Sequence, residues 1–340
     1  MGRSAQDGAG TTQVEGAAPW FADAAGPPAP DACVWLRAPR GPGGAPRLRA
    51  ALWRAPGDDG ADRGLVLLFP GRTEYLEKYA GVVARLRARG FAVASLDWRG
   101  QGLSDRAVPR LGHVGRFAEF QADVRALLGW PEVAAHPGPR VLLCHSMGGC
   151  IGLRAIHDGA LTGEHAPAAA IFSAPMWGLS LGGAALFARP LARLAARLGF
   201  ARRAARPGPA DSTYVLDEPF RNNVLTTDER HWDRFVAQAK AHRELTLASP
   251  TFGWVDAAFA ETAALSRADP AGVPRLLLLG SDEAVVDPEP IRAHAARSRG
   301  EATLAEIRQG RHETLMEDPD GPVGAPVWQA IDDFLHARGL

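Results

Sequence analysis

Residues 141–149 of the chain read VLLCHSMGG, an apolar run that ends in a serine and continues directly into two glycines. The run predicts a buried strand, and the residues after Ser146 predict a sharp turn from that strand into a helix. Strand and helix almost touch at such a turn, so the positions two before and two after the serine need small side chains. Gly148 meets this requirement fully and Cys144 approximately. A buried strand followed by a helix with a serine N-cap would fit the same letters, so the rest of the chain has to decide between the two interpretations.

Short apolar runs recur along the chain between longer segments of helical periodicity. The predicted strands span residues 33–36, 48–53, 65–69, 91–96, 141–144, 168–172, 276–279 and 302–307. The first two are typical of an antiparallel hairpin, and the other six are nearly continuous apolar runs, as in parallel strands covered on both faces. Helices are predicted over residues 74–89, 117–128, 147–158, 288–297 and 323–337. We therefore expect an α/β fold with a doubly wound, mostly parallel eight-stranded sheet.

The alternation of strands and helices breaks once, between residues 177 and 249, where no strand-like run occurs. This segment follows the sixth predicted strand and would project over the carboxyl ends of the strands. We expect a helical cap there, with the core formed by residues 33–176 and 250–340. Residues 1–32 are rich in Gly, Ala and Pro and contain no signal-peptide pattern, so we expect a disordered segment.

One cap helix carries an apolar stripe flanked by arginines. The stripe consists of Leu186, Phe187, Leu191, Leu194 and Leu198, and the arginines are Arg189, Arg193, Arg197, Arg202 and Arg203. We expect the stripe to pack on the protein's own domain. A weak contact between the cap and a membrane surface is the alternative. Pro190 predicts a kink or two short helices.

Composition restricts the class of partner and the compartment. The chain has 340 residues, with 38 Lys and Arg against 38 Asp and Glu, so no overall field attracts nucleic acid. Three cysteines, Cys33, Cys144 and Cys150, form an odd and sparse set that argues against disulfides and against a zinc site. We therefore expect a reducing compartment, the cytoplasm. No apolar run reaches the roughly 18 residues that a transmembrane helix needs.

A serine hydroxyl is a weak nucleophile at neutral pH, so Ser146 would need a base, and the base an orienting acid. Where the serine stands at a strand–turn–helix corner, these partners follow it in the order acid, then histidine. Residues 309–314 read QGRHET after the last predicted strand, and among ten histidines His312 alone combines a strand-end position with this order. We predict His312 as the base. His145 would point in another direction from Ser146, and we expect a structural role for it.

The acid is expected in residues 280–287, which read GSDEAVVD after another predicted strand. Asp282 and Glu283 both lie within reach of the strand end, and spacing alone does not separate them. Asp287 stands before Pro288 and is expected to cap the next helix.

Backbone N–H groups must face the negative charge that develops on the carbonyl oxygen in such a reaction. Met147, whose amide opens the helix after Ser146, is one predicted donor. The second donor should come from the turn after the strand at residues 65–69, and we predict the amide of Arg72. Together these two amides would form an oxyanion hole.

No pattern in the sequence predicts a cofactor or a metal. Residues 100–102 read GQG after a predicted strand, but Asp105 replaces the third glycine of a dinucleotide-binding loop and no helix starts there. His312 and Glu313 are not followed by a second histidine at metalloprotease spacing. We therefore expect neither a cofactor nor a metal.

Four segments together resemble the lysophospholipase and monoacylglycerol lipase group of α/β hydrolases, especially the bacterial inner-membrane lysophospholipases. They read FPGRTEYLEKY at 69–79, DWRGQGLS at 97–104, CHSMGG at 144–149 and GRHE at 310–313. The resemblance runs from about residue 33 to the end of the chain. In that group the acid stands four residues before an Asp that closes its loop, which implies Glu283 rather than Asp282. Cys144, in place of the first turn glycine, and Pro70, in place of a histidine, depart from the pattern.

The triad and the resemblance imply a serine hydrolase of carboxylic esters, with Ser146, His312 and Glu283 as its catalytic residues. The resemblance implies a small acyl ester, a single-chain lipid, as substrate, and a peripheral position at the inner face of the membrane. A proline-type serine aminopeptidase is an alternative, and it would use an acidic group of the cap, among Asp217, Glu218 and Asp228, to hold an amino terminus. A non-catalytic hydrolase-like binding protein is another. The sequence leaves the headgroup and the oligomeric state open.

Overall fold

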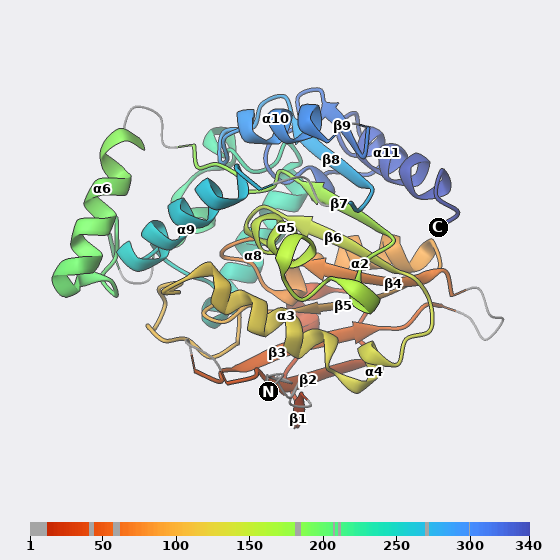
Figure 1. Cartoon of the computed structure of the whole chain (residues 1–340), viewed down its shortest axis with the longest axis horizontal. Helices are drawn as coiled ribbons and strands as arrows, with labels where there is room; N and C mark the ends of the chain where they lie inside the picture. The colour runs from red at the N-terminus through yellow and green to blue at the C-terminus, as the bar shows by residue number, and fades with distance from the viewer. Residues whose placement is uncertain are drawn as a thin grey trace, which may run out of the picture.

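The computed structural model describes residues 12–40, 44–56, 62–180, 185–206, 208–209, 212–268, 272–298 and 300–340. Its centre is a nine-stranded sheet of order β1-β2-β3-β5-β4-β6-β7-β8-β9 (Figure 1). The strands are β1 (Gln13–Ala17), β2 (Ala32–Arg37), β3 (Arg47–Trp53), β4 (Gly64–Phe69), β5 (Phe91–Leu96), β6 (Arg140–His145), β7 (Ala169–Ser173), β8 (Arg275–Gly280) and β9 (Ala302–Ile307).

Strand direction follows the hydrophobic pattern of the sequence. Along the order β5-β4-β6-β7-β8-β9 each strand pairs in parallel with the next, and every residue of β4, β5, β7 and β8 is buried. The predicted hairpin of β2 and β3 is antiparallel, and β3 joins β5 in the antiparallel sense. The expected mostly parallel α/β sheet is therefore confirmed, with nine strands instead of eight.

The additional strand lies in the segment that we expected to be disordered. β1 pairs with β2 at the edge of the sheet, and the short helix α1 (Ala22–Ala25) follows it. The Gln238 amide donates to the carbonyl of Ala24 at 2.8 Å, and Phe21 stacks on His242. The expectation of disorder is therefore wrong for residues 12–32, because an edge strand forms through backbone hydrogen bonds and needs few apolar side chains. Residues 1–11 lie outside the described residues.

Helices cover both faces of the sheet (Figure 1). On one face pack α2 (Ala80–Ala88) and α11 (Gly324–His336), through residues such as Val83 and Ile331. On the other pack α3 (Phe120–Leu128), α5 (Met147–Asp158), α9 (Phe252–Leu265) and α10 (Glu289–Arg297), through residues such as Leu127, Ile151 and Ile291. The 3-10 helix η1 (Leu76–Tyr79) precedes α2, and η2 (Phe117–Glu119) precedes α3; the short α4 (Pro131–Ala134) follows α3, and η3 (Gly163–His165) precedes β7.

Between β7 and β8 the described residues form helices and turns and no strand, at the place where we expected the cap. These elements are α6 (Ala185–Ala195), η5 (Ala196–Phe200), α7 (Tyr214–Asp217), η6 (Phe220–Asn222), α8 (Glu229–Ala241) and η7 (Arg243–Leu245), followed by α9. Helix α9 contacts both α6 and α5, so it joins the cap to the core. In the described part of the chain, no helix is both long and apolar enough to cross a membrane.

Helix α6 lies at the outer edge of the molecule and turns its large apolar side chains to solvent (Figure 1). The exposed fraction ranges from 55% at Leu194 to 75% at Phe187, with Leu191 between these values, and Leu198 in the adjoining η5 is 64% exposed. The helix contacts α9, and of its side chains that the structure describes, from Phe187 to Ala195, the buried one is the small Ala192. Our expectation that the stripe packs on its own domain is therefore wrong, because the alanine face takes that place.

The helix also continues through Pro190 without the expected interruption, and the break in regular geometry comes at Gly199, whose φ is 89°. The side chain of Leu186 lies outside the described residues.

Candidate active site

Ser146 stands at the junction of β6 and α5 with φ 49° and ψ −118°, a left-handed conformation that L residues adopt rarely. A small residue is required at position 148, because a Cβ added to Gly148 would lie 2.1 Å from the carbonyl oxygen of Phe69, at the end of the neighbouring strand β4. The turn holds the serine at the carboxyl end of β6.

Cys144 fits this turn because a second glycine makes room for it. A Cβ added to Gly152, in α5, would lie 2.4 Å from the sulfur of Cys144. The thiol therefore occupies space that the helix leaves open. This pairing explains how the strand and helix approach each other without glycine at position 144.

His312 and Glu283 are joined by a hydrogen bond of 2.8 Å between Nδ1 and Oε2, and their side chains are 5% and 1% exposed. The other carboxylate oxygen accepts the amides of Val285 and Val286 at 2.7 and 3.1 Å. Burial alone would raise the pKa of Glu283, but the hydrogen bond and charge of His312 together with these amides lower it below its ordinary value. The carboxylate is thus fixed at both oxygens and stays charged.

Asp282 does not take this position. Its side chain is exposed and accepts a hydrogen bond from the Ser281 hydroxyl at 2.9 Å. Asp287 accepts from the amide of Glu289 at 3.1 Å, at the start of α10, as expected of a helix cap. The structure therefore brings Glu283, and not Asp282, to His312.

Ser146 and His312 line one cavity of about 720 Å³, a size typical of small-molecule sites. The strand ends form its floor, and the cap contributes residues on the other side. Apolar lining residues include Met176, Leu179, Val215, Leu225, Phe235 and Trp254. Ser146 and His312 thus line one cavity beneath the cap, and Glu283 is hydrogen-bonded to His312.

The turn after β4 presents one backbone amide without a partner. The Gly71 amide donates to the carboxylate of Glu74, and the Thr73 amide donates to Oε1 of Gln101 at 2.7 Å. The amide of Arg72, between them, has no acceptor among the described residues. Met147 opens α5, where first-turn amides have no acceptor within the helix. The two predicted oxyanion donors are therefore available for a ligand.

Pro70 keeps a role in this turn although it replaces a histidine of the resembled group. Its carbonyl accepts a hydrogen bond from the indole of Trp98 at 2.9 Å. Trp98 and Gln101 both belong to the segment after β5, so the oxyanion turn is held by two hydrogen bonds to this segment. Our sequence analysis did not assign this supporting role to residues 97–102, although it noted their DWRGQG motif.

A buried ionic cluster connects the oxyanion turn, the histidine loop and the cap. Lys78 donates to Glu74 and, at 2.7 Å, to Glu313, the residue after His312. Nε2 of His231, on α8, lies 3.1 Å from the other oxygen of Glu313. Burial acts to raise the pKa of both carboxylates, and the charge of Glu313 also acts to raise that of Glu74. The charge and hydrogen bond of Lys78 nevertheless bring the pKa of Glu74 below its ordinary value. The charge of Lys78 and the hydrogen bond with His231 do the same for the pKa of Glu313. Sequence reasoning missed this cluster.

Glu74, His145 and Glu313 also form a group of three possible metal ligands among the described residues. The ammonium of Lys78 already bonds to both carboxylates and supplies the positive charge there. Burial lowers the pKa of His145 to about 4, and its ring packs 4.8 Å from the ring of His312. His145 is therefore neutral at physiological pH, as suits the structural role that we expected.

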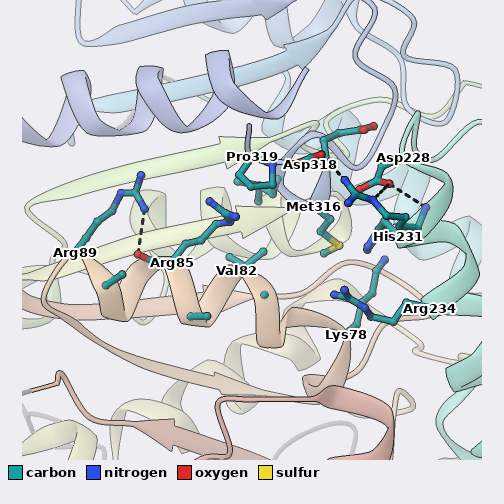
Figure 2. Close-up of a pocket in the computed structure, with 16 residues that line it drawn as sticks. Lys78, Val82, Arg85, Arg89, Asp228, His231, Arg234, Met316, Asp318 and Pro319 are labelled. Atoms are coloured by element: carbon teal, nitrogen blue, oxygen red, sulfur yellow. Dashed lines mark hydrogen bonds and ion pairs between the residues drawn. The ribbon is translucent and has the colours of Figure 1, made fainter. Parts of the chain in front are cut away.

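A second cavity, of about 550 Å³, lies between α2, α8 and the turn η8 (Thr314–Met316) (Figure 2). Figure 2 shows Arg85 on α2 and Arg234 on α8 at its walls. Lys78 lines both cavities, but neither Ser146 nor His312 lines this one. The second cavity is therefore not the candidate active site.

Comparison with known proteins agrees with the fold. Residues 60–319 match the family described as "Serine aminopeptidase, S33". Lysophospholipase L2 of Escherichia coli is 34% identical over 232 residues, which cover 66% of this chain and 64% of that protein. The match thus spans less than two thirds of the relative's length. A monoacylglycerol lipase of Mycolicibacterium smegmatis is 41% identical over 92 residues, 26% of this chain and 31% of that protein.

A solved structure of a soluble variant of monoglyceride lipase from Saccharomyces cerevisiae superposes with a TM-score of 0.70, covering 92% of this chain and 97% of the other. At 18% identity this likeness shows a shared fold. Because the family match covers most of the chain, the chain belongs to the serine aminopeptidase S33 family and, within the α/β hydrolases, to the group that resembles lysophospholipases and monoacylglycerol lipases.

Proposed function

We propose that the protein is a serine hydrolase of carboxylic esters. The observation that carries the proposal is the 2.8 Å hydrogen bond between His312 and Glu283 in the cavity that contains Ser146. Ser146 Oγ attacks the ester carbonyl while Nε2 of His312 takes its proton. Glu283 holds the imidazole in the required tautomer.

The negative charge on the carbonyl oxygen is met by the amides of Met147 and Arg72. The ester C–O bond then breaks, His312 returns the proton to the leaving alcohol, and an acyl-enzyme remains on Ser146. Water, deprotonated by His312, attacks this acyl-enzyme and releases the carboxylic acid and free Ser146. No cofactor takes part in these steps.

We propose a single-chain lipid, a lysophospholipid or a monoacylglycerol, as substrate. The names of the relatives and the apolar lining of the cavity support this class. Each methylene buried beneath the cap contributes about 0.8 kcal/mol. The catalytic efficiency kcat/KM should therefore rise by several-fold for each added pair of carbons from short to medium p-nitrophenyl esters. Fatty-acid release should be faster from single-chain than from two-chain lipids, because one cavity admits one chain.

Covalent labelling with a fluorophosphonate tests the nucleophile directly. The wild-type protein should be labelled and the folded Ser146→Ala variant should not. A wild-type protein that resists labelling would instead favour the non-catalytic binding protein.

An aminopeptidase is the second candidate, and the description of the family favours it. Asp217 and Glu218 line the cavity and would be the acids that hold an amino terminus. Asp228 lines the other cavity and accepts the amide of Arg230 at the start of α8, so it does not fit that role. Faster turnover of aminoacyl amides than of any ester, or a kcat/KM that does not rise with acyl chain length, would favour a peptide over a lipid as the substrate.

We also propose that the protein works in the cytoplasm as a peripheral protein at the inner face of the membrane. The exposed apolar side chains of α6 and the arginines of the same segment support this position. The cysteines Cys33, Cys144 and Cys150 are free thiols, as suits a reducing compartment.

A further inference from the structure

Arg72 carries a charge that no acidic side chain of the described residues balances. Its Nη2 donates to the carbonyl of Ala248 at 3.2 Å, and its Cζ lies 5.1 Å from the centre of the Trp254 ring. Its Nε is buried without an acceptor among the described residues. Within that part of the chain, the guanidinium forms no ion pair with a carboxylate.

Burial of a cation without a counter-charge is unfavourable. It lowers the pKa of Arg72 to about 10, so the side chain remains positively charged at neutral pH. Lys78, which lines the same cavity, is by contrast paired with Glu74 and Glu313. A positive charge that has no carboxylate partner in the described part of the chain, in the cavity that Ser146 also lines, indicates a site for an anion that arrives with the ligand.

The position of Arg72 relates this site to the ester. A Cβ added to Gly71, the preceding residue, would lie 3.1 Å from the Cβ of Ser146, so the backbone of the turn is next to the nucleophile. The side chain of Arg72 extends from there to Ala248, which precedes α9, and to Trp254, in the first turn of α9. One residue thus links the place of the ester carbonyl to a second region of the cavity.

We propose that the guanidinium of Arg72 binds the phosphate of a phosphorylated glycerol headgroup. This proposal rests on the proposed function and deepens it. In a lysophospholipid, one glycerol backbone separates the ester from the phosphate. The amide of Arg72 faces the ester oxygen while its guanidinium pairs with the phosphate. The enzyme therefore prefers lysophospholipids to uncharged monoacylglycerols of the same acyl chain.

The test compares kcat/KM for 1-lauroyl-glycero-3-phosphoglycerol with that for 1-monolauroylglycerol, both as monomers in solution. In Arg72→Gln the ratio of the two values should fall about tenfold or more, because a charge-assisted hydrogen bond is lost for one substrate only. Both substrates use the same oxyanion hole, so the ratio cancels any change in the backbone of the turn. Arg72→Lys should restore part of the ratio. Arg206→Gln is the matched control, since this exposed arginine lines the same cavity.

A binding measurement on the wild-type protein requires no variant. Glycerol 3-phosphate should inhibit hydrolysis of p-nitrophenyl butyrate competitively, glycerol should not, and Arg72→Gln should weaken this inhibition. Laurate tests whether the fatty-acid carboxylate is the anion instead.

Each outcome decides the proposal. An unchanged ratio in folded Arg72→Gln, an equal fall in Arg206→Gln, or Arg72-dependent inhibition by laurate but not by glycerol phosphate would overturn phosphate binding and leave the ester hydrolase intact. Failure of the wild-type protein to cleave either lipid would overturn the proposed function, and the phosphate site with it.

Discussion

At the scale of single residues, two adjacent acids in one loop have different environments. Glu283 has both oxygens bonded and is buried, whereas Asp282 is exposed and contacts Ser281. The residues alone left the choice between the two open, because both follow the same strand. Their difference arises from the direction in which the loop turns, and spacing along the chain does not encode that direction.

Replacing each acid by its amide should separate their roles. We expect Glu283→Gln to lower kcat by about 10³-fold or more, since an amide favours the wrong imidazole tautomer. Asp282→Asn is the matched control and should change kcat by less than about twofold. Steady-state kinetics on a medium-chain p-nitrophenyl ester measure both, and the reverse ranking would assign the role to Asp282.

The same hydrogen bond should affect stability in acid. The pKa of Glu283 in the folded protein is below the ordinary 4.5, so the contribution of this carboxylate to stability is complete above that value and is lost as the pH falls through the lower folded pKa. We expect the difference in unfolding free energy between wild type and Glu283→Gln to shrink as the pH falls from neutral to below about 4. Urea unfolding at each pH measures it. A difference that stays constant or grows would contradict the assignment.

At the scale of elements, the ionic cluster fixes three segments to one another. Lys78 belongs to η1, Glu74 to the oxyanion turn, and Glu313 to the histidine loop, while His231 comes from α8 of the cap. The relative position of nucleophile, base and cap thus depends on one buried ammonium group.

Lys78→Met should leave the buried carboxylates of Glu74 and Glu313 without the ammonium that they share. Removal of one partner of a buried ion pair costs about 3–5 kcal/mol, so the variant should unfold at a clearly lower temperature. Arg87→Met is the control on α2, because the side chain of Arg87 donates to the exposed carbonyl of Arg54 and forms no ion pair with a carboxylate of the described residues. We expect it to change the unfolding free energy by less than about 0.5 kcal/mol. Equal melting temperatures of the two variants would show that the cluster does not hold the segments together.

The elements were predicted well where burial sets the pattern. The apolar runs of β4 to β8 and the strand–helix corner at Ser146 could be predicted from the sequence, since both faces of these strands are covered. β1 was missed because Gln13–Ala17 is an edge strand with mostly exposed side chains. The cluster around Lys78 was missed because its members are distant in the chain, and only the sheet brings them together.

At the scale of the whole molecule, the cap exposes one apolar surface. We call Phe187, Leu191, Leu194 and Leu198 the α6 face. The stripe was visible in the sequence, but its direction was not, because the alanines of the same helix offer a second face for packing. Ala192 occupies that second face and is buried. A helix with this arrangement suits the interface of a bilayer.

The α6 face should bind vesicles that contain anionic lipid. Leu191→Asp combined with Leu198→Asp should weaken cosedimentation with phosphatidylglycerol vesicles by about tenfold or more, since two apolar side chains are lost and two negative charges added. Val14→Asp, at the exposed edge strand, is the control. Hydrolysis of a dissolved short-chain ester should not change in either variant. Equal vesicle binding by all three proteins would exclude the α6 face as a membrane contact.

The thiol of Cys144, two residues before Ser146, can be used to measure local opening of the structure. Burial raises the pKa of Cys144 and of Cys150 well above the ordinary value, and raises that of Cys33 to about 12, so none of the three is a reactive thiolate at neutral pH. Cys144 can meet a maleimide only when β6 separates from α5. Its alkylation rate would therefore measure how often β6 and α5 separate. The protein should keep full activity in the presence of the maleimide for as long as these two elements stay packed together.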